Sequence, residues 1–90
     1  MNKIYKYYIP FQDLHMDWTL ALRKNSIVRH VGEQSGQVYI WVEIDEDFMF
    51  DTEERTFFIV GTGQFIDFNS EYIGTVQMEN GLVWHVYERM

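Results

Sequence analysis

The sequence predicts an all-β fold, mainly antiparallel, in which a small twisted sheet of about six or seven short strands curls into a barrel or a sandwich. Two observations favour this fold class. Apolar and polar residues alternate with a period near two along most of the chain, as they do in half-buried strands. Turn-forming residues separate these segments at short intervals. The 90 residues contain no linker-like segment, so we expect one small β domain spanning 1–90.

The first two expected strands lie near the N-terminus. Segment 3–9 (KIYKYYI) alternates in polarity and ends at Pro10, which cannot donate a hydrogen bond to a neighbouring strand. In segment 16–22 (MDWTLAL) every second residue is apolar, which predicts a half-buried strand. A short helix within 11–24 is the alternative for this region, because an apolar stripe with helical spacing can also be drawn there.

The middle of the chain predicts a hairpin. Segments 26–31 (SIVRHV) and 37–44 (QVYIWVEI) are rich in β-branched and aromatic residues, which favour strands. Ser35 and Gly36 between them are turn formers. The residues of the second segment expected to face the core are Val38, Ile40, Val42 and Ile44.

The C-terminal third predicts three further strands. Segment 55–61 (RTFFIVG) is a nearly continuous apolar run, which is typical of a strand buried on both faces. Segments 71–78 and 82–88 alternate in polarity and are separated by Glu79, Asn80 and Gly81. Asn-Gly between alternating segments predicts a hairpin with a type I′ turn, because both residues tolerate positive φ.

Composition and charge exclude several classes of protein. The chain has 14 acidic and 7 basic residues, a net charge of −7 and no cysteine. Direct nucleic-acid binding is disfavoured because the basic residues are scattered. Disulfides, thiolate catalysis and cysteine-based zinc sites are excluded. No apolar run reaches the ~20 residues of a membrane span, and the N-terminus lacks a signal-peptide pattern. We therefore expect a cytoplasmic protein without membrane contact.

Seven of the twelve positions in 43–54 are acidic, and they are interleaved with Phe48, Met49 and Phe50. One interpretation is a solvated loop that keeps a small β protein soluble. The other is an acidic surface with an apolar anchor that docks on a basic partner. The candidate partner-binding residues are Glu43, Asp45, Glu46, Asp47, Phe48, Phe50, Asp51, Glu53 and Glu54.

A Gly-Thr-Gly sequence at 61–63 follows the apolar run, as a phosphate-binding loop would follow a strand. No helix is predicted after it, and the Lys-Ser/Thr of a P-loop is missing. A bend or β-bulge is one interpretation. A backbone nest that binds an anionic ligand is the other, and its candidate residues are Arg55, Gly61, Thr62, Gly63 and Tyr72.

No other motif predicts chemistry. The three histidines are far apart in the sequence and lack a metal-binding spacing. Asp45 does not begin a calcium loop, because Phe50 and Thr56 stand where glycine and glutamate are required. The serines have no nucleophile-elbow sequence, and no acid and base pair can be assigned. We expect a protein that is not an enzyme and that uses no metal or cofactor.

The segments ERTFFIVGTGQFID (54–67), YIGTVQ (72–77) and LVWHVYE (82–88) carry a family resemblance, together with KYYIP and VYIWVEID earlier in the chain. In this order they resemble a family of short uncharacterised proteins of tailed bacteriophages and prophages, with a Gly-Thr-Gly and Tyr-Ile-Gly-Thr-Val signature. The resemblance covers most of the chain. It departs from the family at 22–26 (LRKNS), where a proline-containing turn is expected.

The resemblance implies a phage accessory protein acting in the cytoplasm of a bacterial host, as a monomer or homodimer. Combined with the acidic surface, it predicts a non-enzymatic, anti-CRISPR-like protein that inhibits or modulates a host protein with a basic, nucleic-acid-binding surface. Two alternatives stay open. One is a sponge that sequesters a nucleotide signal of host immunity through 61–63. The other is a minor virion or assembly protein that self-associates through exposed aromatic residues and sheet edges.

Overall fold

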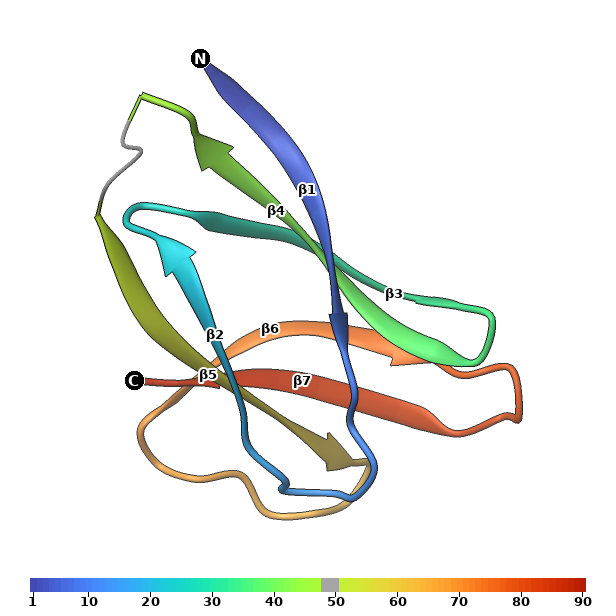
Figure 1. The fold of residues 1–90 in the computed structure, drawn as a ribbon. Coiled ribbons are helices and arrows are strands. Elements are labelled where there is room, and N and C mark those ends of the chain that lie inside the picture. The colour runs from blue at the N-terminus through green and yellow to red at the C-terminus, as the bar shows by residue number, and fades with distance from the viewer. Residues whose placement is uncertain (48–50) are drawn as a thin grey trace.

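The computed structural model describes residues 1–47 and 51–90, and these residues form seven strands and no helix (Figure 1). Every strand pairing is antiparallel, which confirms the predicted fold class. The strands are β1 (Asn2–Ile9), β2 (Trp18–Arg23), β3 (Ile27–Gln34), β4 (Gln37–Asp45), β5 (Thr52–Gly61), β6 (Ser70–Gln77) and β7 (Val83–Arg89).

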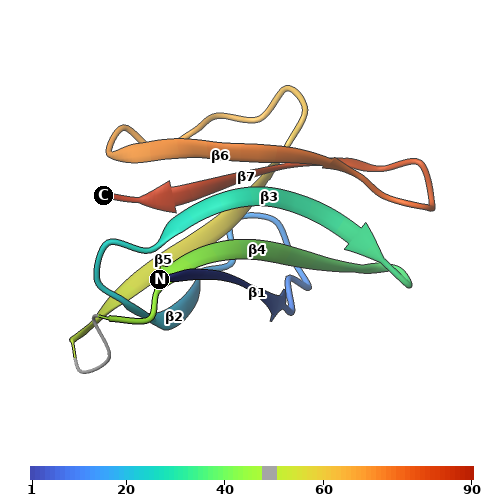
Figure 2. The same ribbon diagram turned by 90° about the horizontal axis from the view of Figure 1, so that it is seen from above.

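The strands form two sheets that pack as an open sandwich. The first sheet has the order β1-β4-β3, and the second has the order β2-β5-β7-β6. Consecutive strands β4 and β5 belong to different sheets. Figures 1 and 2 show β3 lying beside β6, where the edges of the two sheets meet. Within the described residues the sheets do not join into a closed barrel, so the sandwich is the form that the chain adopts.

The core lies between the sheets and is centred on β4 and β5. The inward-facing residues of β4 are buried as predicted, and they are Val38, Ile40, Val42 and Ile44. β5 is buried on both faces over 57–60, also as predicted. Phe57 and Ile59 face the core, while Phe58 and Val60 lie on the outer face of the sheet. A strand of this kind needs cover on its outer side as well.

Arg89 helps to provide that outer cover. Its guanidinium carbon lies 4.2 Å from the centre of the Phe58 ring. The same side chain forms ion pairs with Asp17 (2.8 Å) and Asp67 (2.5 Å), from the loop before β2 and the loop after β5. His15 stacks near Phe58 with a ring separation of 6.4 Å. One arginine therefore connects two loops across a buried aromatic ring.

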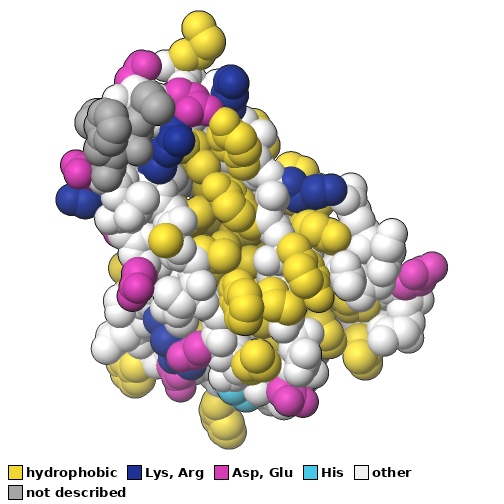
Figure 3. Space-filling model, in the orientation of Figure 1, with side chains coloured by type: hydrophobic (Ala, Val, Ile, Leu, Met, Phe, Trp, Pro, Cys, Tyr) yellow, Lys and Arg dark blue, Asp and Glu magenta, His cyan; other side chains and the backbone are white. Residues whose placement is uncertain are grey.

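The two sides of the sandwich differ in how closely the two sheets approach each other. On the β3/β6 side the sheets approach closely, because a Cβ on Gly74 would stand 3.1 Å from Val31 Cγ2. On the other side Tyr7 of β1 and Trp18 and Leu20 of β2 are only half-buried against the core. Figure 3 shows a continuous band of apolar side chains on the face where β1 lies in front.

The β3–β4 and β6–β7 hairpins form as predicted, but their turns differ. Ser35 and Gly36 both have positive φ (54° and 78°) in a two-residue turn, as a type I′ turn requires. The type I′ turn predicted at Asn80-Gly81 is wrong, since among these two only Gly81 has positive φ (91°). Gly81 N donates to Met78 O, and the Asn80 side chain accepts from Leu82 N. This is a three-residue loop that ends in a left-handed glycine.

The helix considered within 11–24 is not formed. Residues 11–17 make turns and loop, and β2 follows from Trp18. The register of β2 with β5 places Trp18 opposite Phe57 and Leu20 opposite Arg55. Strand pairing satisfies the backbone hydrogen bonds and buries Leu22 at the same time. The sequence of this short segment fits both the spacing of a strand and that of a helix, and pairing with β5 favours the strand.

Candidate functional site

The described parts of the acidic segment, residues 43–47 and 51–54, lie at one end of the sandwich, at the upper left of Figure 1. Two backbone hydrogen bonds hold these parts in place. Glu46 N donates to Met1 O (3.0 Å), and Lys24 N donates to Asp51 O (3.0 Å). The start of β1 and the turn between β2 and β3 therefore both contact the segment that leads from β4 to β5. We call this end of the molecule, residues 43–47 and 51–54, the acidic end.

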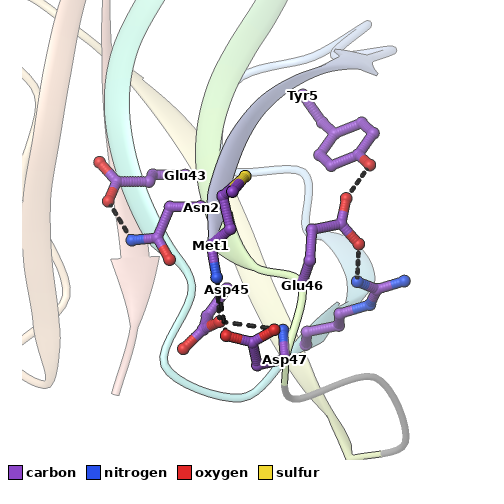
Figure 4. Close-up of polar contacts among 8 residues, drawn as sticks. Met1, Asn2, Tyr5, Glu43, Asp45, Glu46 and Asp47 are labelled. Carbon is purple, nitrogen blue, oxygen red and sulfur yellow. Dashed lines mark hydrogen bonds and ion pairs between the residues drawn. The ribbon is translucent and has the colours of Figure 1, made fainter.

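Glu43 and Glu46 each accept two hydrogen bonds from side chains of the same chain, and Figure 4 shows the contacts of Glu43 with Asn2 and of Glu46 with Tyr5. Glu43 accepts hydrogen bonds from Asn2 Nδ2 (2.6 Å) and Arg29 Nε (2.9 Å). Glu46 accepts from the Tyr5 hydroxyl and from Arg23 Nη1 (2.6 Å). The hydrogen bond from Asn2, followed by that from Arg29, lowers the pKa of Glu43. The hydrogen bonds from Tyr5 and Arg23 lower the pKa of Glu46 in the same way.

These contacts predict a loss of stability in acid. The folded pKa of Glu46 lies below its ordinary value of 4.5, so its contribution is complete above that pH and is lost as the pH falls through the folded pKa. We expect the free energy of unfolding to decrease below about pH 4.5, and Glu46→Gln to make this decrease shallower. Urea unfolding followed by circular dichroism at several pH values measures both. Glu54→Gln is the matched control, and an equal slope in both variants would contradict the prediction.

The other acidic residues fall into two groups. Asp47 Oδ2 lies 2.7 Å from the terminal ammonium of Met1, and Asp45 Oδ1 accepts from Asp47 N (2.9 Å). Asp51, Glu53 and Glu54 are exposed, and within the described residues they form no ion pair. Phe48 and Phe50, which were predicted to bind the partner, lie outside the described residues, as does Met49. Among the described residues of the acidic end, the exposed carboxylates without an ion pair are thus those of Asp51, Glu53 and Glu54.

The Gly-Thr-Gly sequence closes β5 as a tight turn. Gln64 N donates to Gly61 O (3.1 Å), and Gly61 N donates to the Gln64 side chain (2.8 Å). Gly63 has a φ of 89°, which favours glycine. Residues 64–69 then lead from this turn to β6. The N–H groups of Gly61 and Gln64 are therefore both used within the turn itself.

Arg55 is not brought to this turn. It forms a bidentate ion pair with Glu88 (Nε 2.6 Å, Nη2 2.8 Å) and donates to Ser26 O (2.5 Å). The hydrogen bonds to Glu88 raise the pKa of Arg55. Six positions of extended strand separate Arg55 from Gly61, which corresponds to ~20 Å. The candidate ligand-binding residues therefore do not form one site.

Two of the candidate ligand-binding residues, Thr62 and Tyr72, are connected by hydrogen bonds that run through His85 and Thr75. Thr62 Oγ1 lies 2.9 Å from His85 Nε2, and His85 Nδ1 lies 3.0 Å from Thr75 Oγ1. Thr75 Oγ1 is 2.7 Å from the Tyr72 hydroxyl. A neutral imidazole donates from one nitrogen and accepts at the other, so both of its polar atoms are satisfied here. The chain of hydrogen bonds fixes the turn at 61–63 to the outer face of β7 and β6.

An apolar groove of about 510 Å³ includes Thr62 in its lining. Sequence reasoning missed it, because it is built from three segments that are far apart in the chain and meet where β5 ends and β7 begins. Its volume is within the range of ligand sites. The lining residues are Gln12, Asp13, Leu14, Gly61, Thr62, Gly81, Leu82, Val83 and Trp84. We call this feature the Leu82 groove.

Residues 1–47 and 51–90 contain neither a metal-binding cluster nor a membrane-spanning helix. No group of three or more His, Cys, Asp or Glu side chains is arranged to hold a metal ion. No helix in this part of the chain has the length and apolarity to cross a membrane. The acidic end and the Leu82 groove are therefore the surface features considered as candidate binding sites.

The fold and these surfaces define a small β-sandwich domain. The chain belongs to the family DUF7352, a domain of unknown function, whose model matches residues 1–90. Comparison with curated proteins and with solved structures found no match.

Proposed function

We propose that this domain is a non-enzymatic protein-binding module whose acidic end docks on a basic protein. The observation that carries the proposal is the division among its carboxylates. Glu43 and Glu46 are held by arginines of the same chain, whereas Asp51, Glu53 and Glu54 are exposed beside them. Complementary charge of this kind accelerates encounter and selects the partner.

The resemblance to bacteriophage proteins supplies the biological context of the proposal. In that context the partner is a bacterial host protein with a nucleic-acid-binding surface, such as a component of an antiviral defence system. The domain inhibits or modulates it in the host cytoplasm by occupying a surface built for nucleic acid. The net charge of −7 supports this competition, because a nucleic-acid-binding surface attracts negative charge. The proposal assigns no catalytic role to any residue.

Charge reversal at Glu53 and Glu54 tests the proposal. A tagged chain is used to capture a host protein from the lysate of a phage-sensitive bacterium, and the association rate with the purified partner is then measured. We expect Glu53→Lys/Glu54→Lys to lower this rate at least about tenfold at low salt, with a smaller difference at high salt, because screening weakens steering. Glu46 is left intact, since reversing it would break its contacts to Tyr5 and Arg23.

The matched control raises the net charge by the same amount at the other end of the sandwich. It combines Gln37→Lys, Gln77→Lys and Glu79→Lys, which are all exposed. Equal effects of both variants would show that only the overall charge matters and would contradict the acidic end as the docking site. A nucleotide that copurifies with the chain would favour the sponge, and capture of further copies of the chain would favour the virion role.

A further inference from the structure

The Leu82 groove has a composition that defines what it can bind. Leu14, Leu82, Val83 and Trp84 line it with apolar surface, and Leu14 and Leu82 are 39% and 52% exposed. Leu14 lies close to Gly61 at the groove, since a Cβ at that glycine would stand in ordinary van der Waals contact with Leu14 Cδ1 (3.5 Å). Apolar side chains exposed together around a hollow are a mark of a binding surface.

One charged residue, Asp13, lies among the residues that line the groove. The four arginines of the chain form ion pairs elsewhere, with Glu46, Glu43, Glu88 and with Asp17 and Asp67. Lys6 donates to Gln34 within the β1-β4-β3 sheet. Among the described residues that line the groove there is no lysine, arginine or histidine, so the groove presents apolar surface and one carboxylate. A ligand that combines an apolar group with a positive charge is complementary to both features.

The loop that leaves the groove at Thr62 carries exposed apolar side chains of its own. It carries Phe65 and Phe68, whose side chains are almost fully exposed (96% and 103%). The loop is anchored at its far end, because Asp67 pairs with Arg89 and Asn69 O accepts from Met90 N (2.9 Å). Exposed aromatic side chains on an anchored loop lose less conformational freedom on binding than those on a free segment. Aromatic residues are also the commonest anchors of protein interfaces.

We infer that the Leu82 groove binds an extended peptide segment of the partner, in which an apolar side chain stands next to a lysine or arginine. This inference rests on the proposed function for the basic character of the partner. The groove volume suits a few side chains rather than a packed helix or sheet. A second copy of this chain is a poor occupant, because its own net charge of −7 would bring further carboxylates to Asp13.

Selection of short random peptides on the immobilised full chain tests the inference. We expect enriched sequences to place a large apolar residue beside lysine or arginine. Fluorescence polarisation then measures the affinity of an enriched peptide for two variants, Leu82→Asp and Asp13→Lys. Each should weaken binding about tenfold or more, which corresponds to the loss of about 1.4 kcal/mol. Both residues are exposed, so the fold should be retained, and circular dichroism checks this.

Two controls separate this inference from the proposed function. Ile4→Ser removes an equally exposed apolar side chain (54%) on β1 and should leave peptide affinity unchanged. Glu53→Lys/Glu54→Lys should also leave it nearly unchanged, because the acidic end and the groove lie at opposite ends of β5. The inference is overturned if no peptide is enriched, if enriched peptides are acidic, or if they bind the two groove variants as tightly as the original chain.

Discussion

Replacing Phe57 by alanine is expected to lower the free energy of unfolding by about 3–5 kcal/mol, because it removes a fully buried aromatic ring and leaves a cavity. Phe57 is 0% exposed and lies in the core, on the strand that pairs with both β2 and β7. A chain of this size has a total stability of roughly 5–13 kcal/mol. The loss is thus a large fraction of the whole, and urea unfolding followed by tryptophan fluorescence measures it.

Phe65→Ala is the matched control for that substitution. Its side chain is 96% exposed, so removing it should change the stability by less than about 0.5 kcal/mol. The same chemical change should therefore have very different costs at the two positions. If both variants unfolded at the same urea concentration, Phe57 would not occupy the core as described.

The second large effect is expected at the ion pair between Arg55 and Glu88. Arg55 and Glu88 side chains are only 15% and 11% exposed. Arg55→Met leaves the Glu88 carboxylate in a nearly buried position without its partner, and it also removes the donor to Ser26 O. We expect a loss of about 3 kcal/mol, at the lower end of the range for a broken buried pair because both groups retain some exposure. Thermal or urea unfolding at neutral pH measures it.

A double variant shows how much of this loss of stability comes from the buried Glu88 carboxylate that has lost its partner. In Arg55→Met/Glu88→Leu no buried carboxylate remains, so much of the stability should return. Arg29→Met removes the partner of Glu43 at a half-exposed site and should cost much less, since water screens the remaining charge. A double variant no more stable than Arg55→Met would show that packing and the Ser26 contact, rather than charge burial, dominate.

The separation of the two surfaces limits how a partner can use both. The acidic end lies at the start of β5 and the Leu82 groove lies at its end, and ten residues of extended strand span ~33 Å. A protein that contacts both must reach along the full length of this strand. A partner with an interface of ordinary size can cover one of these two surfaces completely or parts of both. Separate variants at the acidic end and at the Leu82 groove therefore show which of the two surfaces the partner contacts.

Local patterns in the sequence determined the secondary structure well. The seven predicted segments correspond to the seven strands, and the core residues of β4 were identified by alternation alone. Burial on both faces of β5 followed from its apolar run. These predictions succeeded because a strand shows its two faces within a few consecutive residues. The predicted turn type at Asn80-Gly81 failed because the loop length between strands, which sets the turn, depends on the register of both strands.

The tertiary structure decided the character of the two surfaces. The sequence by itself determined that this is a small acidic all-β domain with a cluster of carboxylates at 43–54. It did not show that Glu43 meets Arg29 and that Glu46 meets Arg23, or that Leu14, Gly61 and Leu82 form one groove. These contacts join residues that are distant in the chain, and their geometry depends on which strands pair and how the two sheets pack. Alternation specifies which face of a strand is buried but carries no information about which strand lies beside it.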